Sequence, residues 1–99
     1  MDLAEIASAL RGRVSGKTPI GGTLKFDLGS DGSLFVDGTG PGNTVAASKN
    51  DPANCTVRMN AQDLKDLLDG RLQPAAAFMQ GRMRIDGDMV LAMKLGQLV

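Results

Sequence analysis

Two pairs of carboxylates in this 99-residue chain stand close enough in the sequence to act together in chemistry. Asp66 and Asp69 lie three residues apart in a helical pattern, so both would share one helix face. Asp86 and Asp88 flank Gly87. Such pairs could transfer protons or bind a hard cation. We favour structural roles, because Asp69 precedes a helix stop, Asp88 can cap the next helix, and no histidine supplies a further ligand.

Other catalytic and cofactor signals are weak. Histidine, tryptophan and tyrosine are absent, and Cys55, the single cysteine, has no histidine to serve as its base, so we expect it to be a small buried side chain. The glycines of residues 38–42 do not fit a dinucleotide-binding motif. Residues 12–18 superficially resemble the end of a phosphate loop, but they follow a predicted helix. We therefore expect no enzyme, no catalytic residues, no metal and no cofactor.

Charge and composition narrow the partners and the location. Eleven basic and eleven acidic residues cancel and are spread along the chain, which disfavours nucleic-acid binding. No apolar run approaches the roughly 18 residues of a membrane span, so we expect at most transient membrane contact. A lone cysteine and no signal-like segment indicate a cytoplasmic protein. The length fits one domain, residues 1–99.

The hydropathy pattern predicts both helices and strands. Apolar residues recur at helical spacing or alternate with period two in successive segments. We expect helices over residues 3–13, 61–69, 75–80 and 89–98, and strands over residues 23–28, 34–37, 44–48, 55–59 and 82–86. The first four strands should form a meander. Helices between and after the strands favour an α+β fold, a five-stranded, mainly antiparallel sheet covered on one face by helices.

Turn and cap residues support these boundaries. Asp2 and Asn60 can cap the first and second helices. Asp31-Gly32 favours a hairpin turn, because glycine accepts the positive φ that tight turns need. Gly70 fits the left-handed residue after a helix, and Pro74 fits the first turn of the next one.

An ordered series of short motifs carries a family resemblance. The series is Asp69-Gly70, then Pro74, then Ala77-Phe78-Met79-Gln80-Gly81, then Ile85-Asp86-Gly87-Asp88, and finally Leu91-Ala92-Met93-Lys94-Leu95. In this order it resembles the sterol carrier protein 2 (SCP2) domain family, most firmly over residues 53–98. Asn54 stands where that family usually has aspartate. The resemblance implies an SCP2-like fold with an apolar cavity between sheet and helices, a lipid carrier, and no catalytic residues.

The last helix is apolar on more than one face. It carries seven large apolar side chains, too many for one stripe of a short surface helix: Met89, Val90, Leu91, Met93, Leu95, Leu98 and Val99. A lipid cavity, a dimer interface or plain core burial could cover the second face, and core burial is the commonest outcome on residue type alone. The resemblance favours the cavity.

The segment before the fifth strand offers further candidates. Ala75–Ala77 are explained by helix propensity alone, so only Phe78 and Met79 are candidate cavity residues there. The residue matching Gln80 lies near the ligand in the SCP2 family. A helix C-terminal glutamine can equally bond the backbone, and both roles stay open for Gln80.

We therefore expect a lipid carrier that holds a fatty-acyl, sterol-like or other apolar ligand. The alternative is a ligand-free homodimer that serves as an accessory module of a lipid-modifying enzyme. The predicted ligand-binding residues are Phe26, Leu28, Leu34, Val36, Leu68, Phe78, Met79, Gln80, Met83, Met89 and Met93.

Overall fold

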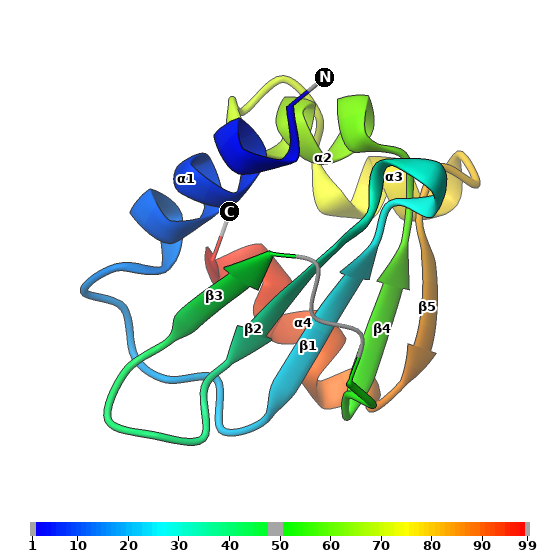
Figure 1. Ribbon diagram of the computed structural model, residues 1–99. Helices are drawn as coiled ribbons and strands as arrows, with labels where there is room; N and C mark the ends of the chain where they lie inside the picture. The colour runs from blue at the N-terminus through cyan, green and yellow to red at the C-terminus, as the bar shows by residue number, and fades with distance from the viewer. Residues whose placement is uncertain (1, 48–50, 99) are drawn as a thin grey trace.

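The computed structural model describes residues 2–47 and 51–98, which form a sheet and four α-helices (Figure 1). The helices are α1 (Leu3–Val14), α2 (Ala61–Leu68), α3 (Pro74–Met79) and α4 (Met89–Leu98). The strands are β1 (Thr23–Asp27), β2 (Ser33–Asp37), β3 (Thr44–Ala47), β4 (Cys55–Arg58) and β5 (Arg84–Gly87), with a short 3₁₀ turn, η1 (Gly29–Asp31). Each predicted element is present within one or two residues of its expected ends, except that Ser48 lies outside the described residues.

The five strands are ordered β3-β2-β1-β4-β5. Only the β1–β4 pair is parallel, and the three other pairs are antiparallel. The α+β, mainly antiparallel fold class is therefore confirmed. The predicted four-strand meander is wrong at its last step, because β4 adds to β1 and not to β3, with Leu24 opposite Cys55. This arrangement makes β1 the central strand, and Phe26 is accordingly fully buried.

The predicted capping and turn residues have these roles in the structure. The Asp2 carboxylate accepts a hydrogen bond from Ala4 N (2.9 Å), and the Asn60 side-chain oxygen accepts one from Asp63 N (2.7 Å). Gly70 has a φ of 78° after α2. The β1–β2 hairpin closes through η1, where Gly32 has a φ of 108°. Local sequence thus determines where these elements begin and end.

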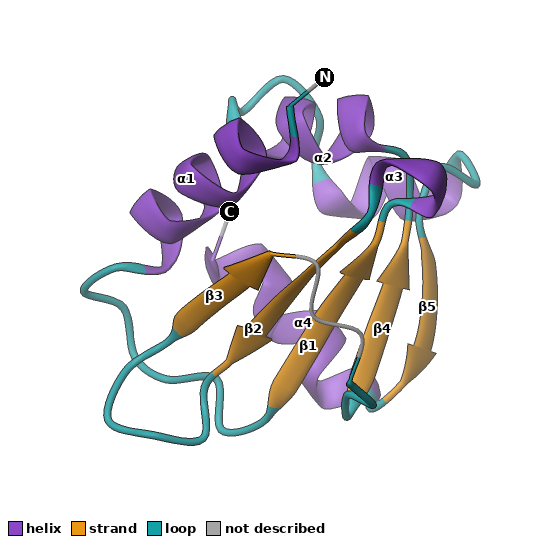
Figure 2. Ribbon diagram, in the orientation of Figure 1, coloured by secondary structure: helices purple, strands orange, loops and turns teal. Residues whose placement is uncertain are grey.

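The helices cover one face of the sheet; in Figure 2, α4 crosses behind it. Side chains on that inner face come from every second strand residue, as in the alternating burial of β1. The largest fully buried side chains are Phe26, Leu10, Leu24, Leu34, Leu64, Val14, Val36, Val57 and Cys55. Residues of α1, α2 and the sheet thus fill the middle of the domain.

Gly87 joins β5 to α4 at a close approach between backbones. Its φ is 108°, and a Cβ atom there would meet the carbonyl oxygen of Asn54, with Cys55 Cα 3.2 Å away. That Asn54 carbonyl also accepts a hydrogen bond from Asp88 N (2.8 Å). The start of α4 is therefore fixed to the start of β4.

Candidate functional site

An apolar groove of about 280 Å³ lies between α3, β5 and the first turns of α4, and we call it the α3–α4 groove. It is open to solvent. All of its lining side chains are apolar: Pro74, Ala75, Phe78, Met83, Ile85, Met89, Ala92 and Met93. Three of the eight are methionines, whose flexible side chains adapt to ligands of irregular shape.

The α4 wall of the groove is held firmly against the sheet. Leu91 is 5% exposed and lies so close over Gly22 that a Cβ there would meet Leu91 Cδ1 at 2.8 Å. Lys94 Nζ donates to the Ile20 carbonyl at 2.9 Å. The carboxylate of Asp88 accepts from Val90 N (2.8 Å), so Asp88 caps the helix as predicted. These contacts fix α4 while other side chains of the helix face the groove.

The α3 wall is held more lightly. Within this six-residue helix Ala77 is the only side chain classed as buried. Gly70 and Gly81, with φ of 78° and 74°, stand before and after α3, and the Arg82 N–H donates to the Ala77 carbonyl (2.9 Å). A ligand in the groove would thus contact one rigid wall and one wall with few anchoring contacts.

The structure brings together four of the predicted binding residues. Phe78, Met83, Met89 and Met93 line the groove. Of these, Phe78, Met89 and Met93 are 51%, 54% and 76% exposed, so a ligand could bury much of their surface. Their role in binding stays a prediction.

The structure places the other predicted residues elsewhere. Five lie in the packed core, each at most 3% exposed, because side chains of α1 and α2 fill the space over the inner sheet face: Phe26, Leu28, Leu34, Val36 and Leu68. Met79 is 86% exposed, and both it and Gln80 lie outside the groove lining. The Gln80 backbone N–H bonds the Ala76 carbonyl at 2.9 Å.

Four lining residues were not predicted from the sequence: Pro74, Ala75, Ile85 and Ala92. Ile85 carried a usable signal, since it alternates with Met83 on the inner side of β5. That signal could be used only once β5 was known to be an edge strand beside α3 and α4.

The candidate carboxylates have structural partners, and the candidate cysteine is buried. Asp66 accepts from Gln62 Nε2 (3.0 Å), and Asp86 lies 3.9 Å from Arg58 Nη1. Cys55 is fully buried, and its pKa is raised first by that burial and then by the charges of Asp88 and Asp86. A raised pKa suppresses the thiolate that a nucleophile needs. Within the described ranges, no group of three His, Cys, Asp or Glu residues could hold a metal.

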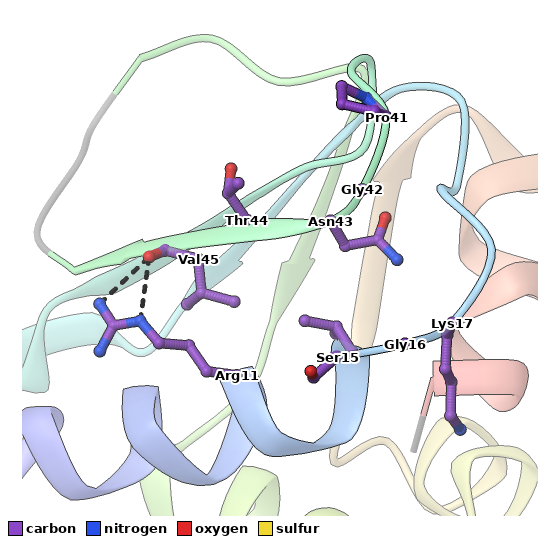
Figure 3. A pocket seen from close by; sticks show the side chains of 10 residues that line it. Arg11, Ser15, Gly16, Lys17, Pro41, Gly42, Asn43, Thr44 and Val45 are labelled. Atoms are coloured by element: carbon purple, nitrogen blue, oxygen red, sulfur yellow. Dashed lines mark hydrogen bonds between the residues drawn. The ribbon is translucent and has the colours of Figure 1, made fainter.

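A second, larger hollow of about 620 Å³ lies between the end of α1 and the loop before β3 (Figure 3). Arg11 Nε and Nη2 both donate to the Val45 carbonyl there, at 3.3 and 3.1 Å. Ser15, Gly16 and Lys17 of the phosphate-loop-like segment also line it. They follow the C-terminus of α1, whose dipole disfavours phosphate. The polar surroundings suit an acyl chain less well than the α3–α4 groove does.

Comparison with known proteins places the chain in a family. The model of the SCP-2 sterol transfer family matches residues 9–99. Sterol carrier protein 2 of Gallus gallus is 36% identical in an alignment 84 residues long, which covers 80% of this chain and 15% of that protein. The chain thus spans less than one sixth of that relative's length.

Solved structures share the fold. The crystal structure of sterol carrier protein 2 like 2 from Aedes aegypti superposes with a TM-score of 0.78 at 20% identity, over 97% of this chain and 94% of that one. The solution structure of palmitated SCP2L2 from the same organism gives 0.75 at 23% identity, over 98% and 93%. On the family match, the sequence identity and this shared architecture, the chain belongs to the SCP-2 sterol transfer family, a family of lipid-binding domains.

Proposed function

We propose that this protein carries a lipid whose apolar part lies in the α3–α4 groove. One observation carries the proposal: the five large apolar side chains that remain exposed in the described part of the chain are all on α3 and α4. Three of these five, Phe78, Met89 and Met93, line the groove. Exposed apolar surface that gathers at one place typically marks a binding site.

Burial of apolar surface would supply the affinity. Each methylene that enters the groove contributes about 0.8 kcal/mol, so about ten of them give about 8 kcal/mol, which corresponds to micromolar binding. No charged group inside the groove is needed for this. The palmitated Aedes aegypti structure supports an acyl ligand as one candidate.

The proposed role is carriage or presentation and not catalysis. Membership of a lipid-binding family, a buried Cys55 with a raised pKa, and structural roles for Asp66, Asp86 and Asp88 support this. In the described ranges no helix has the length and apolarity that crossing a membrane requires. We propose a cytoplasmic protein that meets membranes only transiently.

Native mass spectrometry of protein purified from cells under mild conditions tests the proposal. We expect a monomer with stoichiometric lipid, and loss of that lipid in Phe78→Asp and Met93→Asp, because each places a charge in the apolar groove. Val90→Asp is the matched control, since Val90 is on α4 and 61% exposed but does not line the groove.

The same exposed surface on α3 and α4 favours a second candidate, a ligand-free homodimer that acts as an accessory module. A clean dimer that ignores added fatty acid and fatty-acyl-CoA would contradict the carrier and support this module. Retention of lipid in both Asp variants of the groove would mean that the lipid lies elsewhere.

A further inference from the structure

We infer that the lipid-free chain pairs with a second copy of itself along the open edge of β5, and that a lipid in the α3–α4 groove competes with this pairing. The pairing itself stands on the residues of β5 alone. The competition rests on the proposed function and deepens it, because it makes the lipid-free and the lipid-bound carrier differ in their association.

The two edge strands of the sheet, β3 and β5, differ in how their outer backbone groups are covered (Figure 1). At the β3 edge the Val45 carbonyl accepts hydrogen bonds from Arg11 of α1, at 3.3 Å from Nε and 3.1 Å from Nη2. At the β5 edge no described residue provides such a cap. An uncapped strand edge is a template for pairing with a further strand.

The hydrogen bonds on the two sides of β4 show which backbone groups of β5 point outward. Asp88 N donates to the Asn54 carbonyl at 2.8 Å, toward β4. Met59 N donates to the Asp27 carbonyl at 3.1 Å, on the other side of β4. Because hydrogen-bonded and non-hydrogen-bonded pairs alternate along an antiparallel ladder, the N–H and C=O of Ile85 point away from β4. These two groups are therefore free to exchange hydrogen bonds with Ile85 of a second copy.

The charges along β5 are self-complementary in one antiparallel register. The segment reads Arg82-Met83-Arg84-Ile85-Asp86-Gly87-Asp88, with both basic residues before Ile85 and both acidic residues after it. When Ile85 lies opposite Ile85 of the second copy, Arg84 faces Asp86 of that copy, and the outer arginine faces the outer aspartate. These residues form the non-hydrogen-bonded pairs, in which side chains lie closest.

Other registers bring like charges together. A shift of two residues, which the outward backbone groups also allow, places Arg84 opposite Arg84 or Asp86 opposite Asp86. Directly opposed charges of unlike sign stabilise a strand pair, and those of like sign destabilise it. The sequence of β5 therefore favours the register centred on Ile85.

Arg84 and Asp86 are available for these contacts. Both side chains are exposed, and no described residue pairs with Arg84. Arg84 lies directly opposite Arg58 of β4, a like-charge pair that a carboxylate of a second copy would relieve. Asp86 contacts Arg58 through Oδ2 at 3.9 Å, and its side chain is 73% exposed. The second oxygen of Asp86 can therefore accept a further partner.

This pairing would cover the groove of each copy. Residues opposite each other in an antiparallel pair project to the same face, so Ile85 of both copies lies on the helix side of the extended sheet. Ile85 lines the α3–α4 groove, together with the exposed side chains of Phe78, Met89 and Met93. The second copy and a lipid would cover the same apolar side chains, and each therefore excludes the other.

Sedimentation velocity of the delipidated protein over about a hundredfold range of concentration tests the pairing. The four residues of β5 make a small interface, so we expect a reversible dimer that dissociates on dilution. Dodecanoate at about ten times its dissociation constant, below its micelle concentration, should raise the dimer dissociation constant about a hundredfold, because both chains must release their ligand before they pair.

Charge reversal tests the register. Arg84→Asp and Asp86→Arg should each weaken dimerisation at least about tenfold, because two attractive pairs become repulsive. An equimolar mixture of the two variants should form a heterodimer in native mass spectrometry, because each chain then supplies the charge that the other lacks. This recovery would also show that both variants fold. Lys65→Asp, which makes the same change of charge on the exposed face of α2, is the matched control and should leave the dimer unchanged.

The outcomes separate this inference from the proposed function. A delipidated chain that stays monomeric at every concentration, or single variants that dimerise like the wild type, would overturn the pairing through β5. A dimer whose dissociation constant stays constant while dodecanoate binds would overturn the competition and leave the carrier intact. Failure of dodecanoate to bind at all would instead contradict the proposed function, and the charge variants alone would then decide the pairing.

Discussion

Replacing Gly87 with alanine should destabilise the fold more than the same change at any other glycine with a matching backbone angle. Gly87 has a φ of 108°, which costs an L-residue about 1–3 kcal/mol. Its new Cβ would also meet the Asn54 carbonyl oxygen and approach Cys55 Cα, both parts of the backbone. Overpacking of this kind costs a further 1–3 kcal/mol or more, because β4 and β5 must separate to relieve it.

Gly32 provides the matched control. Its φ is also 108°, but a Cβ there would meet only the side chain of Leu3, with Cδ2 at 3.0 Å and Cδ1 at 3.9 Å, and this side chain can rotate away. Gly32→Ala should therefore incur the backbone cost alone. We expect Gly87→Ala to lower the free energy of unfolding by about 2 kcal/mol more than Gly32→Ala, a large part of the roughly 5–15 kcal/mol that a domain of this size has.

Urea unfolding, followed by far-UV circular dichroism, measures the difference directly. With a slope of about 1–2 kcal/mol/M, the midpoints of the two variants should differ by about 1–2 M. Equal midpoints would refute the reasoning, since they would show that β5 and β4 can shift without loss of stability. Because Gly87 joins β5 to α4, which both contribute to the groove, Gly87→Ala should also weaken ligand binding in protein that remains folded.

Two further predictions concern Cys55 and Asn54. The pKa of the Cys55 thiol is raised by burial, Asp88 and Asp86, so the unfolded chain loses its thiol proton first. The contribution of this thiol to the free energy of unfolding should therefore be fully present below about pH 8.5 and be lost as the pH rises through the folded-state pKa. Urea midpoints measured across that range should fall in the wild type relative to Cys55→Ala. Parallel curves for the two proteins would contradict a raised pKa of Cys55. Asn54→Asp should change the free energy of unfolding by less than about 0.5 kcal/mol. The Asn54 side chain accepts hydrogen bonds through Oδ1 from Thr23 N (2.9 Å) and Thr23 Oγ1 (3.1 Å). A carboxylate can accept both bonds. A loss of about 2 kcal/mol in thermal unfolding would show that the side-chain NH₂ group matters.

Local sequence predicted the elements well because their boundaries depend on nearby residues. Asp2, Asn60 and Asp88 cap helices through their own backbone neighbours, and Gly70 ends α2 without help from distant parts of the chain. The family resemblance, which rests on the order of motifs between residues 69 and 95, was also confirmed. These features are local or ordered along the chain.

The local sequence pattern could not predict which strand β4 pairs with, or where the groove lies. Nothing near Cys55 indicates whether its strand adds to β3 or to β1, because period-two alternation is the same in both cases. Phe26 and Val36 are fully buried, yet period-two alternation cannot distinguish a filled core from a cavity wall. That distinction depends on how closely α1 and α2 approach the sheet.

The parallel β1–β4 pair has a consequence for the order of folding. The β1–β2 hairpin can form early, whereas Thr23 and Asn54, which join β1 to β4, are 31 residues apart. All three elements around the groove, α3, β5 and α4, follow β4 in the chain. We expect them to assemble after the folding transition state, so a bound ligand should slow unfolding and leave the folding rate nearly unchanged. Stopped-flow measurements of the unfolding rate with and without ligand test this. The lifetime of the folded protein, more than its rate of folding, would then depend on the bound lipid.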